Sequence, residues 1–208
     1  MRRGIVCATA ALGLWVGLSF ARAEADCQLP SSPEPAQPAT LYQLATGPSW
    51  VRFDAKAFLH DFAGQTSRIQ GTIRVADTDR LADAQACIQI DAASLDTANS
   101  TRDGIMRSEH LETTRFPTID FLLQAVHAVI LRGESLEFTA AGTLSLHGVR
   151  RQIQLPVRAH REGDAVLLAG QLPLKMSDYH IRIPRFLMFT VDDQVLVSFN
   201  VTARPAQR

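Results

Sequence analysis

The sequence lacks the short motifs by which several classes of enzyme are identified. No serine stands in a G-x-S-x-G segment, no glycine-rich loop suited to a phosphate is present, and no C-x-x-C pair occurs. The six histidines are scattered singly, without the H-x-x-x-H or Cys/His spacing of a metal site. These absences disfavour a serine hydrolase, a phosphate-cradling enzyme, a dithiol oxidoreductase and a zinc or iron protein.

An excess of charge of one sign is also lacking, because 21 lysine and arginine residues balance 21 aspartate and glutamate residues. Nucleic-acid binding needs a basic stripe on the protein surface, so we expect no nucleic-acid partner. Beyond residue 20 no run is long and apolar enough to span a bilayer. We therefore expect the chain that follows the N-terminal segment to be soluble.

The first 23 residues have the layout of a secretory signal peptide. Met1-Arg2-Arg3 is basic, the chain from Gly4 to Phe20 is almost wholly apolar, and Ala21-Arg22-Ala23 has the small residues of a cleavage site. We expect residues 1–23 to be removed after Ala23 and the remaining chain to be exported. An uncleaved N-terminal anchor is the alternative, and the shortness of the apolar run disfavours it.

Proline is concentrated in the next segment, between Gln28 and Thr40, where it favours extended and solvated chain. We interpret residues 24–40 as a linker, residues 41–203 as one folded domain and residues 204–208 as a short tail. The exported chain keeps two cysteines, Cys27 and Cys87, which are a candidate disulfide pair in an oxidising compartment. The sequence alone does not show that the two are close enough in space to be joined.

Apolar and polar residues alternate through most of the domain, which is the pattern of strands with one buried face. Eight such runs are separated by turn-forming clusters such as Glu162-Gly163-Asp164, and they cover residues 51–57, 69–75, 86–91, 119–123, 136–146, 153–157, 166–174 and 195–201. About eight strands with short connections predict an antiparallel meander. A sheet of this length tends to curl and close, so we expect an all-β antiparallel barrel of about eight strands. A two-sheet sandwich is the competing fold.

One segment, from Ser94 to Pro117, interrupts the alternation. Within it, residues 101–104 are expected to cap a short helix that runs through residues 105–111 and ends before Phe116-Pro117. The prediction is therefore a barrel with one short helix inserted between strands.

The interrupting segment also carries a resemblance to a known family. Ser94-Leu95-Asp96-Thr97, Arg102-Asp103 with Met106-Arg107, and residues 115–121 (RFPTIDF) resemble the central signature of the YceI-like family. Residues 142–149 (GTLSLHGV) are similar to the family's G-x-L-t-l-H-G-v segment, and Ser177-Asp178-Tyr179 is similar to its S-D-F element. The motifs occur in the family's order and span nearly the whole domain.

This resemblance implies a lipocalin-like barrel, usually periplasmic, whose elongated internal pocket binds a polyisoprenoid or a similar amphiphilic lipid. It implies no established reaction. No cofactor is expected, and a bound isoprenoid lipid or a quinone-like molecule is the species that the resemblance suggests. The segment around Leu59-His60-Asp61-Phe62 and the proline-rich extension depart from the family pattern.

We expect the lumen to be lined by the apolar half of each alternation. The candidates are Phe53, Ile73, Ile88, Ile90, Phe121, Phe138, Leu144, Leu155, Val197 and Phe199. Small inward residues are needed to leave a cavity in a barrel of this size, and Ala55, Ala57, Ala86 and Ala140 provide them. Alternation permits a hollow interior but does not distinguish it from a packed one.

Polar candidates come from the interrupting segment and from two turns. If the segment covers one mouth of the barrel, Arg102 and Arg107 would hold an anionic head group, with Met106 lining the pocket. The alternative is that these charged residues brace the short helix. His147 is a candidate to face the ligand, or else to hydrogen-bond its own tight turn. Tyr179 is a candidate to stack on a prenyl chain, or else to lie in an ordinary turn at the barrel rim.

The leading hypothesis is a periplasmic lipid carrier with no catalytic residues. A second hypothesis is an enzyme acting on a small apolar substrate through His147 or Arg102. A third is an accessory module for a membrane respiratory partner such as a cytochrome, which rests only on the family resemblance. The oligomeric state is left open, with a homodimer as one option.

Overall fold

The computed structural model describes residue 29 and residues 39–58, 60–76, 81, 83–186 and 189–206. The predicted signal peptide, Cys27 and most of the predicted linker lie outside these residues. The elements in chain order are β1 (Thr40–Leu44), β2 (Trp50–Ala57), β3 (Phe62–Thr66), β4 (Ile69–Val75), β5 (Gln85–Asp91), η1 (Ala92–Ser94), α1 (Ser100–Ile105), η2 (Met106–His110), β6 (Thr118–Arg132), β7 (Ser135–Leu146), β8 (Val149–Glu162), β9 (Ala165–Lys175), η3 (Ser177–Tyr179), β10 (Arg185–Phe186) and β11 (Phe189–Pro205).

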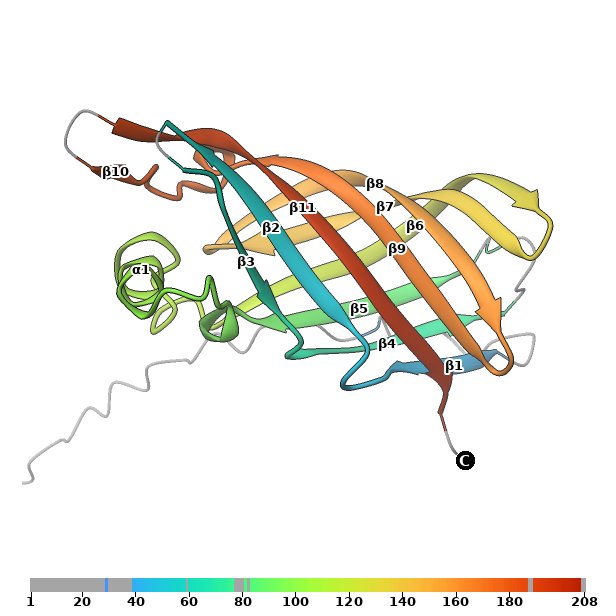
Figure 1. The fold of residues 1–208 in the computed structure, drawn as a ribbon. Helices are drawn as coiled ribbons and strands as arrows, with labels where there is room; N and C mark the ends of the chain where they lie inside the picture. The colour runs from blue at the N-terminus through green and yellow to red at the C-terminus, as the bar shows by residue number, and fades with distance from the viewer. Residues whose placement is uncertain are drawn as a thin grey trace, which may run out of the picture.

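Eight of the strands form a closed antiparallel barrel (Figure 1). Their order around the ring is β1, β4, β5, β6, β7, β8, β9 and β11, and β11 closes the ring by pairing with β1. The hairpin β2–β3 extends the wall, because β2 pairs with the N-terminal part of β11 while β1 pairs with its C-terminal end. The prediction of an all-β barrel is confirmed, and the competing sandwich is wrong.

The strands form where the sequence alternates, and the alternation decides which side chains face inward. On β11, Val195, Val197 and Phe199 line the interior, and the residues between them face outward. The connections follow from turn residues. Between β7 and β8 the turn residues His147 and Gly148 both have positive φ angles, 52° and 74°, as a two-residue type I′ hairpin requires.

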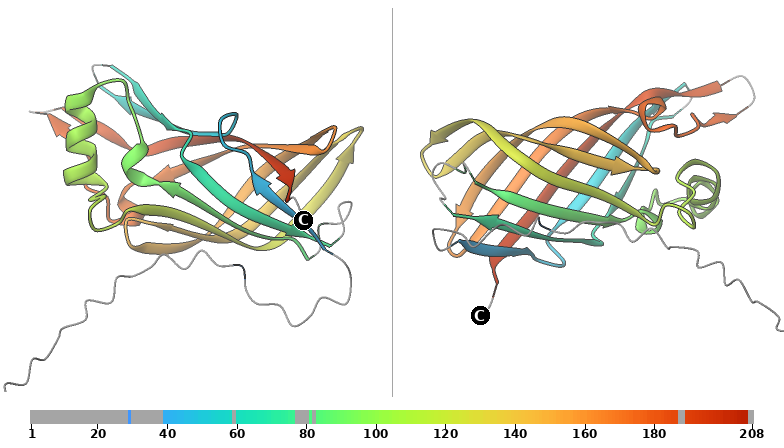
Figure 2. Two further views of the ribbon diagram at one scale, coloured as in Figure 1. Left: turned by 90° about the horizontal axis from the view of Figure 1, so that it is seen from below. Right: turned by 180° about the vertical axis from the view of Figure 1, so that it is seen from behind.

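The segment that interrupts the alternation lies at one end of the barrel. Figure 2 shows α1 at this end and the β6–β7 hairpin at the opposite end in both views. The expected start of the helix is wrong: the side chain of Asn99 accepts a hydrogen bond from the N–H of Arg102, so α1 begins at Ser100. After Ile105 the chain continues as a wider π-helical turn, η2.

The interior of the barrel is hollow. Inward-facing side chains such as Phe53, Phe121, Phe138 and Phe199 are only half-buried, although the barrel wall surrounds them. Tightly buried residues gather instead in three clusters along the wall. Among the described residues no helix is both long and apolar enough to cross a bilayer.

Candidate functional site

The main feature of the barrel is a cavity of about 1780 Å³ that runs through its interior. Pockets for drug-sized ligands have volumes of about 300–1000 Å³, so this cavity has room for a larger molecule. Twelve of the fifteen residues predicted to bind a ligand line it: Phe53, Ile73, Ile88, Ile90, Arg102, Met106, Phe121, Phe138, Leu144, Leu155, Val197 and Phe199.

Small residues on the wall keep the lumen open. The four alanines expected to face inward, Ala55, Ala57, Ala86 and Ala140, all line the cavity. Glycines have a second role, because phenylalanine rings of neighbouring strands lie against them. A Cβ added at Gly170 would lie 2.7 Å from Cε1 of Phe199 and 2.4 Å from the carbonyl oxygen of Pro156. The ring therefore lies close to the wall, where a larger residue would push it into the lumen.

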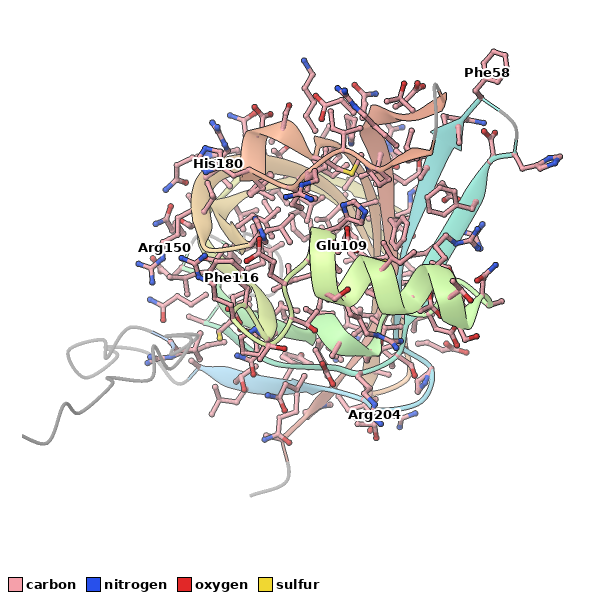
Figure 3. All side chains as sticks on the ribbon, turned by 90° about the vertical axis from the view of Figure 1, so that its left-hand side faces the viewer. Phe58, Glu109, Phe116, Arg150, His180 and Arg204 are labelled. Carbon is pink, nitrogen blue, oxygen red and sulfur yellow. The ribbon has the colours of Figure 1, made fainter. Side chains whose placement is uncertain are left out.

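Polar lining residues are confined to the two ends of the cavity. The end beside α1, called the helix-end mouth, includes His60, Asn99, Thr101, Arg102, Glu109, His110, Ser177, Arg182, Arg185 and Thr190. The opposite end, called the hairpin-end mouth, includes Glu134, His160 and Arg161. Figure 3 looks onto the helix-end mouth, with α1 in front, Glu109 near the barrel interior and Phe58 at the tip of β2. Between the mouths the lining consists of aliphatic and aromatic side chains.

Three arginines line the helix-end mouth in different ways. Arg102 is held in place: its Nε donates to Oγ1 of Thr97 at 2.8 Å, and its guanidinium lies 4.5 Å from the ring centroid of Phe62. Arg182 and Arg185 are exposed, and neither guanidinium has an ion-pair partner among residues that the structure describes. Their donors are therefore available to an anionic group at the mouth.

One hydrogen bond joins the two segments that border this mouth. Nδ1 of His110, at the end of η2, lies 2.7 Å from the carbonyl oxygen of Arg182. A carbonyl oxygen only accepts, so Nδ1 carries the hydrogen. The bond ties the segment after η3, which carries Arg182 and Arg185, to the helical segment.

Three predicted ligand residues lie elsewhere, and their expected placement at the cavity is wrong. Arg107 donates from Nη2 to the carbonyl oxygen of Leu95 at 3.0 Å and borders a separate polar pocket on the outside of the barrel. Tyr179 is 3% exposed in a packed cluster with Leu146 and Val195, and burial raises the pKa of its phenol. It is therefore not available to stack on a ligand in the lumen.

His147 is the third of these residues, and it joins three segments of the chain. Its Nδ1 lies 3.0 Å from the carbonyl oxygen of Tyr179, and its Nε2 lies 3.3 Å from a carboxylate oxygen of Glu112. The ring also packs edge-on against Phe116, with centroids 4.7 Å apart. The alternative stated for His147, a turn held by hydrogen bonds, describes its surroundings in the structure.

Asp103 braces the loop that leads into α1. Its carboxylate is buried and accepts hydrogen bonds from Oγ1 and N of Thr97, at 2.6 and 3.0 Å. Burial opposes ionisation, but these hydrogen bonds and the nearby charge of Arg107 outweigh it and hold the pKa of Asp103 below its ordinary value. The alternative in which the charged group braces the helix therefore holds for Asp103 and Arg107, while Arg102 both braces the loop and lines the cavity.

Sequence reasoning missed Arg182 and Arg185 as mouth residues. They flank Ile183-Pro184 shortly after the S-D-Y element, but nothing in that local pattern places them beside α1, which lies some 80 residues earlier in the chain.

In the structure Cys87 is disulfide-bonded. Its pairing with Cys27 stays a prediction, because Cys27 lies outside the described residues. Within the described ranges no three His, Cys, Asp or Glu side chains gather closely enough to hold a metal ion.

Comparison with known proteins gives one family and several similar structures. Residues 42–203 match the family model described as the YceI-like domain. A search of curated proteins finds no match. Among solved structures, BcnA of Burkholderia cenocepacia has a TM-score of 0.68 and 19% identity, over 76% of this chain and 98% of that one.

Two further structures are similar over most of their length. One is a polyisoprenoid binding domain from Saccharophagus degradans implicated in plant cell wall breakdown, with a TM-score of 0.63 and 20% identity over 79% of this chain and 98% of that one. The other is the YCEI protein of Campylobacter jejuni, with a TM-score of 0.57 and 17% identity over 73% of this chain and 88% of that one. At these identities the likeness concerns the fold.

Proposed function

Because the chain belongs to the YceI-like family, we propose that it is a periplasmic binding protein that carries a polyisoprenoid or a similar amphiphilic lipid in its barrel. The observation that carries this proposal is the lumen itself, which is hollow, about 1780 Å³ in volume, and polar only at its ends. The similar domain from Saccharophagus degradans, which is described as polyisoprenoid binding, supports the same class of ligand.

The physical basis of binding is the burial of hydrocarbon. Each methylene-sized group moved from water into the lumen contributes about 0.8 kcal/mol, so a long prenyl chain binds without any polar contact along its length. The lining supports this, since the residues between the mouths offer a chain only aliphatic and aromatic contacts. The long strands β7 and β8 suit an elongated molecule, because 12 residues of β7 extend about 40 Å along the strand.

The helix-end mouth is the better place for a polar head group. Arg182 and Arg185 have guanidinium groups without ion-pair partners in the described part of the chain, and Arg102 lines the same mouth. Guanidinium groups bind phosphate and carboxylate through paired hydrogen bonds. We therefore place an anionic head group at this mouth and the tail in the lumen. This arrangement supports binding rather than catalysis, because the described residues that line the lumen between the mouths offer the tail aliphatic and aromatic contacts.

Mass spectrometry of an organic-solvent extract of the purified protein tests the proposal directly, with a prenyl lipid as the expected species. Titration of the delipidated protein with geranylgeranyl diphosphate and with geranylgeraniol tests the two halves of the site separately. Recovery of no lipid, combined with no binding of either probe, would refute the carrier function. Cell fractionation tests the periplasmic location, which the N-terminal sequence supports.

The head-group assignment has its own variant pair. Arg182→Gln with Arg185→Gln is expected to weaken geranylgeranyl diphosphate by about tenfold or more, because hydrogen bonds to charged groups contribute about 1.5–3 kcal/mol. Binding of geranylgeraniol, which has no charge, is expected to change little. Arg150→Gln is the matched control, since Arg150 is exposed on β8 and does not line the cavity. Equal losses for the diphosphate and the alcohol would contradict this placement of the head group.

A further inference from the structure

We propose that the helix-end mouth is a docking surface for an anionic lipid bilayer, against which the barrel loads and releases its cargo. The inference rests on the proposed lipid cargo for its purpose, but the features that carry it are those of the protein surface. They are exposed apolar side chains on the rim of the mouth, an excess of positive charge at the same place, and a cavity that opens there.

The first feature is an apolar rim. Phe58, at the end of β2, is 75% exposed, and Ile105, the last residue of α1, is 44% exposed. Both line the cavity, so each is at once part of its wall and part of the surface. Figure 3 shows Phe58 at the tip of β2, at the edge of the view and pointing away from the barrel. Large apolar side chains exposed around the opening of an apolar cavity are typical of a surface that contacts lipid.

The second feature is charge, and it distinguishes the two ends of the barrel. The helix-end mouth is lined by Arg102, Arg182 and Arg185 against a single carboxylate, Glu109. The hairpin-end mouth is lined by one arginine, Arg161, and one glutamate, Glu134. Each basic residue close to an anionic bilayer contributes about 1 kcal/mol of attraction, so the lining of the helix-end mouth favours such a surface more than the lining of the hairpin-end mouth does.

The hairpin end also has exposed apolar residues, and they provide the internal comparison. Ile130 and Leu131 are 48% and 70% exposed near the tip of the β6–β7 hairpin. The charged residues around them are paired with each other, because Arg132 and Arg158 share the carboxylate of Glu137, at 3.2 and 3.0 Å. Apolar exposure is therefore present at both ends, and the larger excess of positive charge among the residues that line the mouth is what selects the helix end.

The third feature is continuity with the cavity. A prenyl chain in water exposes its whole length, which makes free diffusion of a long chain between bilayer and barrel unfavourable. When the helix-end mouth lies on the bilayer, the chain passes from one apolar medium to another through the rim formed by Phe58 and Ile105. The head group stays at the level of the lipid phosphates, beside Arg182 and Arg185.

Co-sedimentation of the purified protein with lipid vesicles tests the inference. Vesicles that contain phosphatidylglycerol are expected to bind the protein, vesicles of phosphatidylcholine alone to bind it less, and high salt to weaken the anionic binding. Phe58→Ser and Ile105→Ser are each expected to lower vesicle affinity by about tenfold. Arg182→Gln and Arg185→Gln are each expected to lower it by about fivefold.

The matched control is Ile130→Ser. Ile130 and Ile105 are the same residue type with nearly the same exposure, at opposite ends of the barrel, and Ile130 does not line the cavity. We expect Ile130→Ser to bind anionic vesicles as the wild type does. An equal loss for Ile130→Ser and Ile105→Ser, or no binding of the wild type to anionic vesicles, overturns the inference. In the second case the rim faces a protein partner or water.

Two wild-type measurements separate this inference from the proposed function. Uptake of geranylgeranyl diphosphate from solution without vesicle binding means that the carrier function stands and the docking surface fails. Vesicle binding without uptake of either prenyl probe means that the carrier function fails, while the docking surface stands. Binding of both supports the two together.

Discussion

Two phenylalanines placed deep in the lumen are expected to limit the chain length that the barrel binds. Ala86 on β5 and Ala140 on β7 line the cavity and belong to one cluster of the wall, away from the helix-end mouth. Replacing both with phenylalanine puts two rings where the distal end of a prenyl tail would lie. A head group at the helix-end mouth remains in place, so short chains are still accommodated and long chains are not.

The magnitude follows from the hydrocarbon that is excluded. At about 0.8 kcal/mol per carbon, keeping one five-carbon isoprene unit out of the lumen costs up to about 4 kcal/mol. That corresponds to a loss of up to about a thousandfold in affinity. The rings also strain the wall, for which overpacking in a core suggests a cost of about 1–3 kcal/mol in stability. The protein is therefore checked by thermal unfolding before binding is compared.

The assay is a series of dissociation constants for geranyl, farnesyl, geranylgeranyl and octaprenyl diphosphates. Wild-type affinity is expected to rise along the series, while the affinity of the Ala86→Phe/Ala140→Phe variant levels off before the longest probe. Ala141→Phe is the matched control, because Ala141 is the next residue on β7 and does not line the cavity. A variant whose affinity rises as the wild type's does, or falls equally for every probe, would refute the reasoning.

Four substitutions test the stability of the fold. His147→Ala is expected to lower the free energy of unfolding in urea by about 1–3 kcal/mol, because it removes a ring that is 8% exposed and bonded to Tyr179 and Glu112; an unchanged value would contradict this role. For Asp103, the folded-state pKa is lowered, so the ionised carboxylate stabilises the fold near neutral pH and this contribution is lost as the pH falls through the folded pKa. The difference in free energy of unfolding between wild type and Asp103→Asn should therefore be largest at neutral pH and should disappear at acidic pH. A difference that does not depend on pH would show that the charge is unimportant. Gly170→Ala should lower thermal stability by about 1–3 kcal/mol through its clash with Pro156 and Phe199. Gly104→Ala, where an added Cβ meets nothing within 4 Å, should raise it by about 0.5–1 kcal/mol through helix propensity. A stabilised Gly170→Ala would contradict the first assignment, and a destabilised Gly104→Ala the second.

Local sequence reasoning succeeded where the property depends on near neighbours in the chain. Alternation identified the inward residues of each strand, because successive side chains of a strand point to opposite faces whatever the strand pairs with. It failed for the helix start, because Asn99 and Thr101 are both suitable capping residues and the choice depends on contacts of the following turn. There the carboxylate of Asp103 accepts hydrogen bonds from Thr97, and α1 begins five residues earlier than expected.

The polar residues show the limit more clearly. The sequence placed Arg102, Arg107, His147 and Tyr179 in one group of candidates because they belong to recognisable motifs. In the structure Arg107 faces the outside of the barrel and donates a hydrogen bond to the carbonyl oxygen of Leu95. His147 forms a hydrogen bond with the carbonyl oxygen of Tyr179. A motif identifies residues that matter to the fold, but it does not distinguish a residue that holds a loop from one that meets a ligand.

The sequence by itself determined eight of the eleven strands, their inward faces and several tight turns, because these follow from the geometry of a single chain segment; the short strands β1, β3 and β10 were not predicted. Only the tertiary structure decided that the barrel is hollow, since this depends on Phe199 meeting Gly170 across a strand pair that the sequence does not specify. The composition of the helix-end mouth was decided in the same way. Arg182 and Arg185 lie beside α1 because closure of the ring brings the segment after η3 and the helical segment to the same end of the barrel. No local sequence pattern predicts this contact.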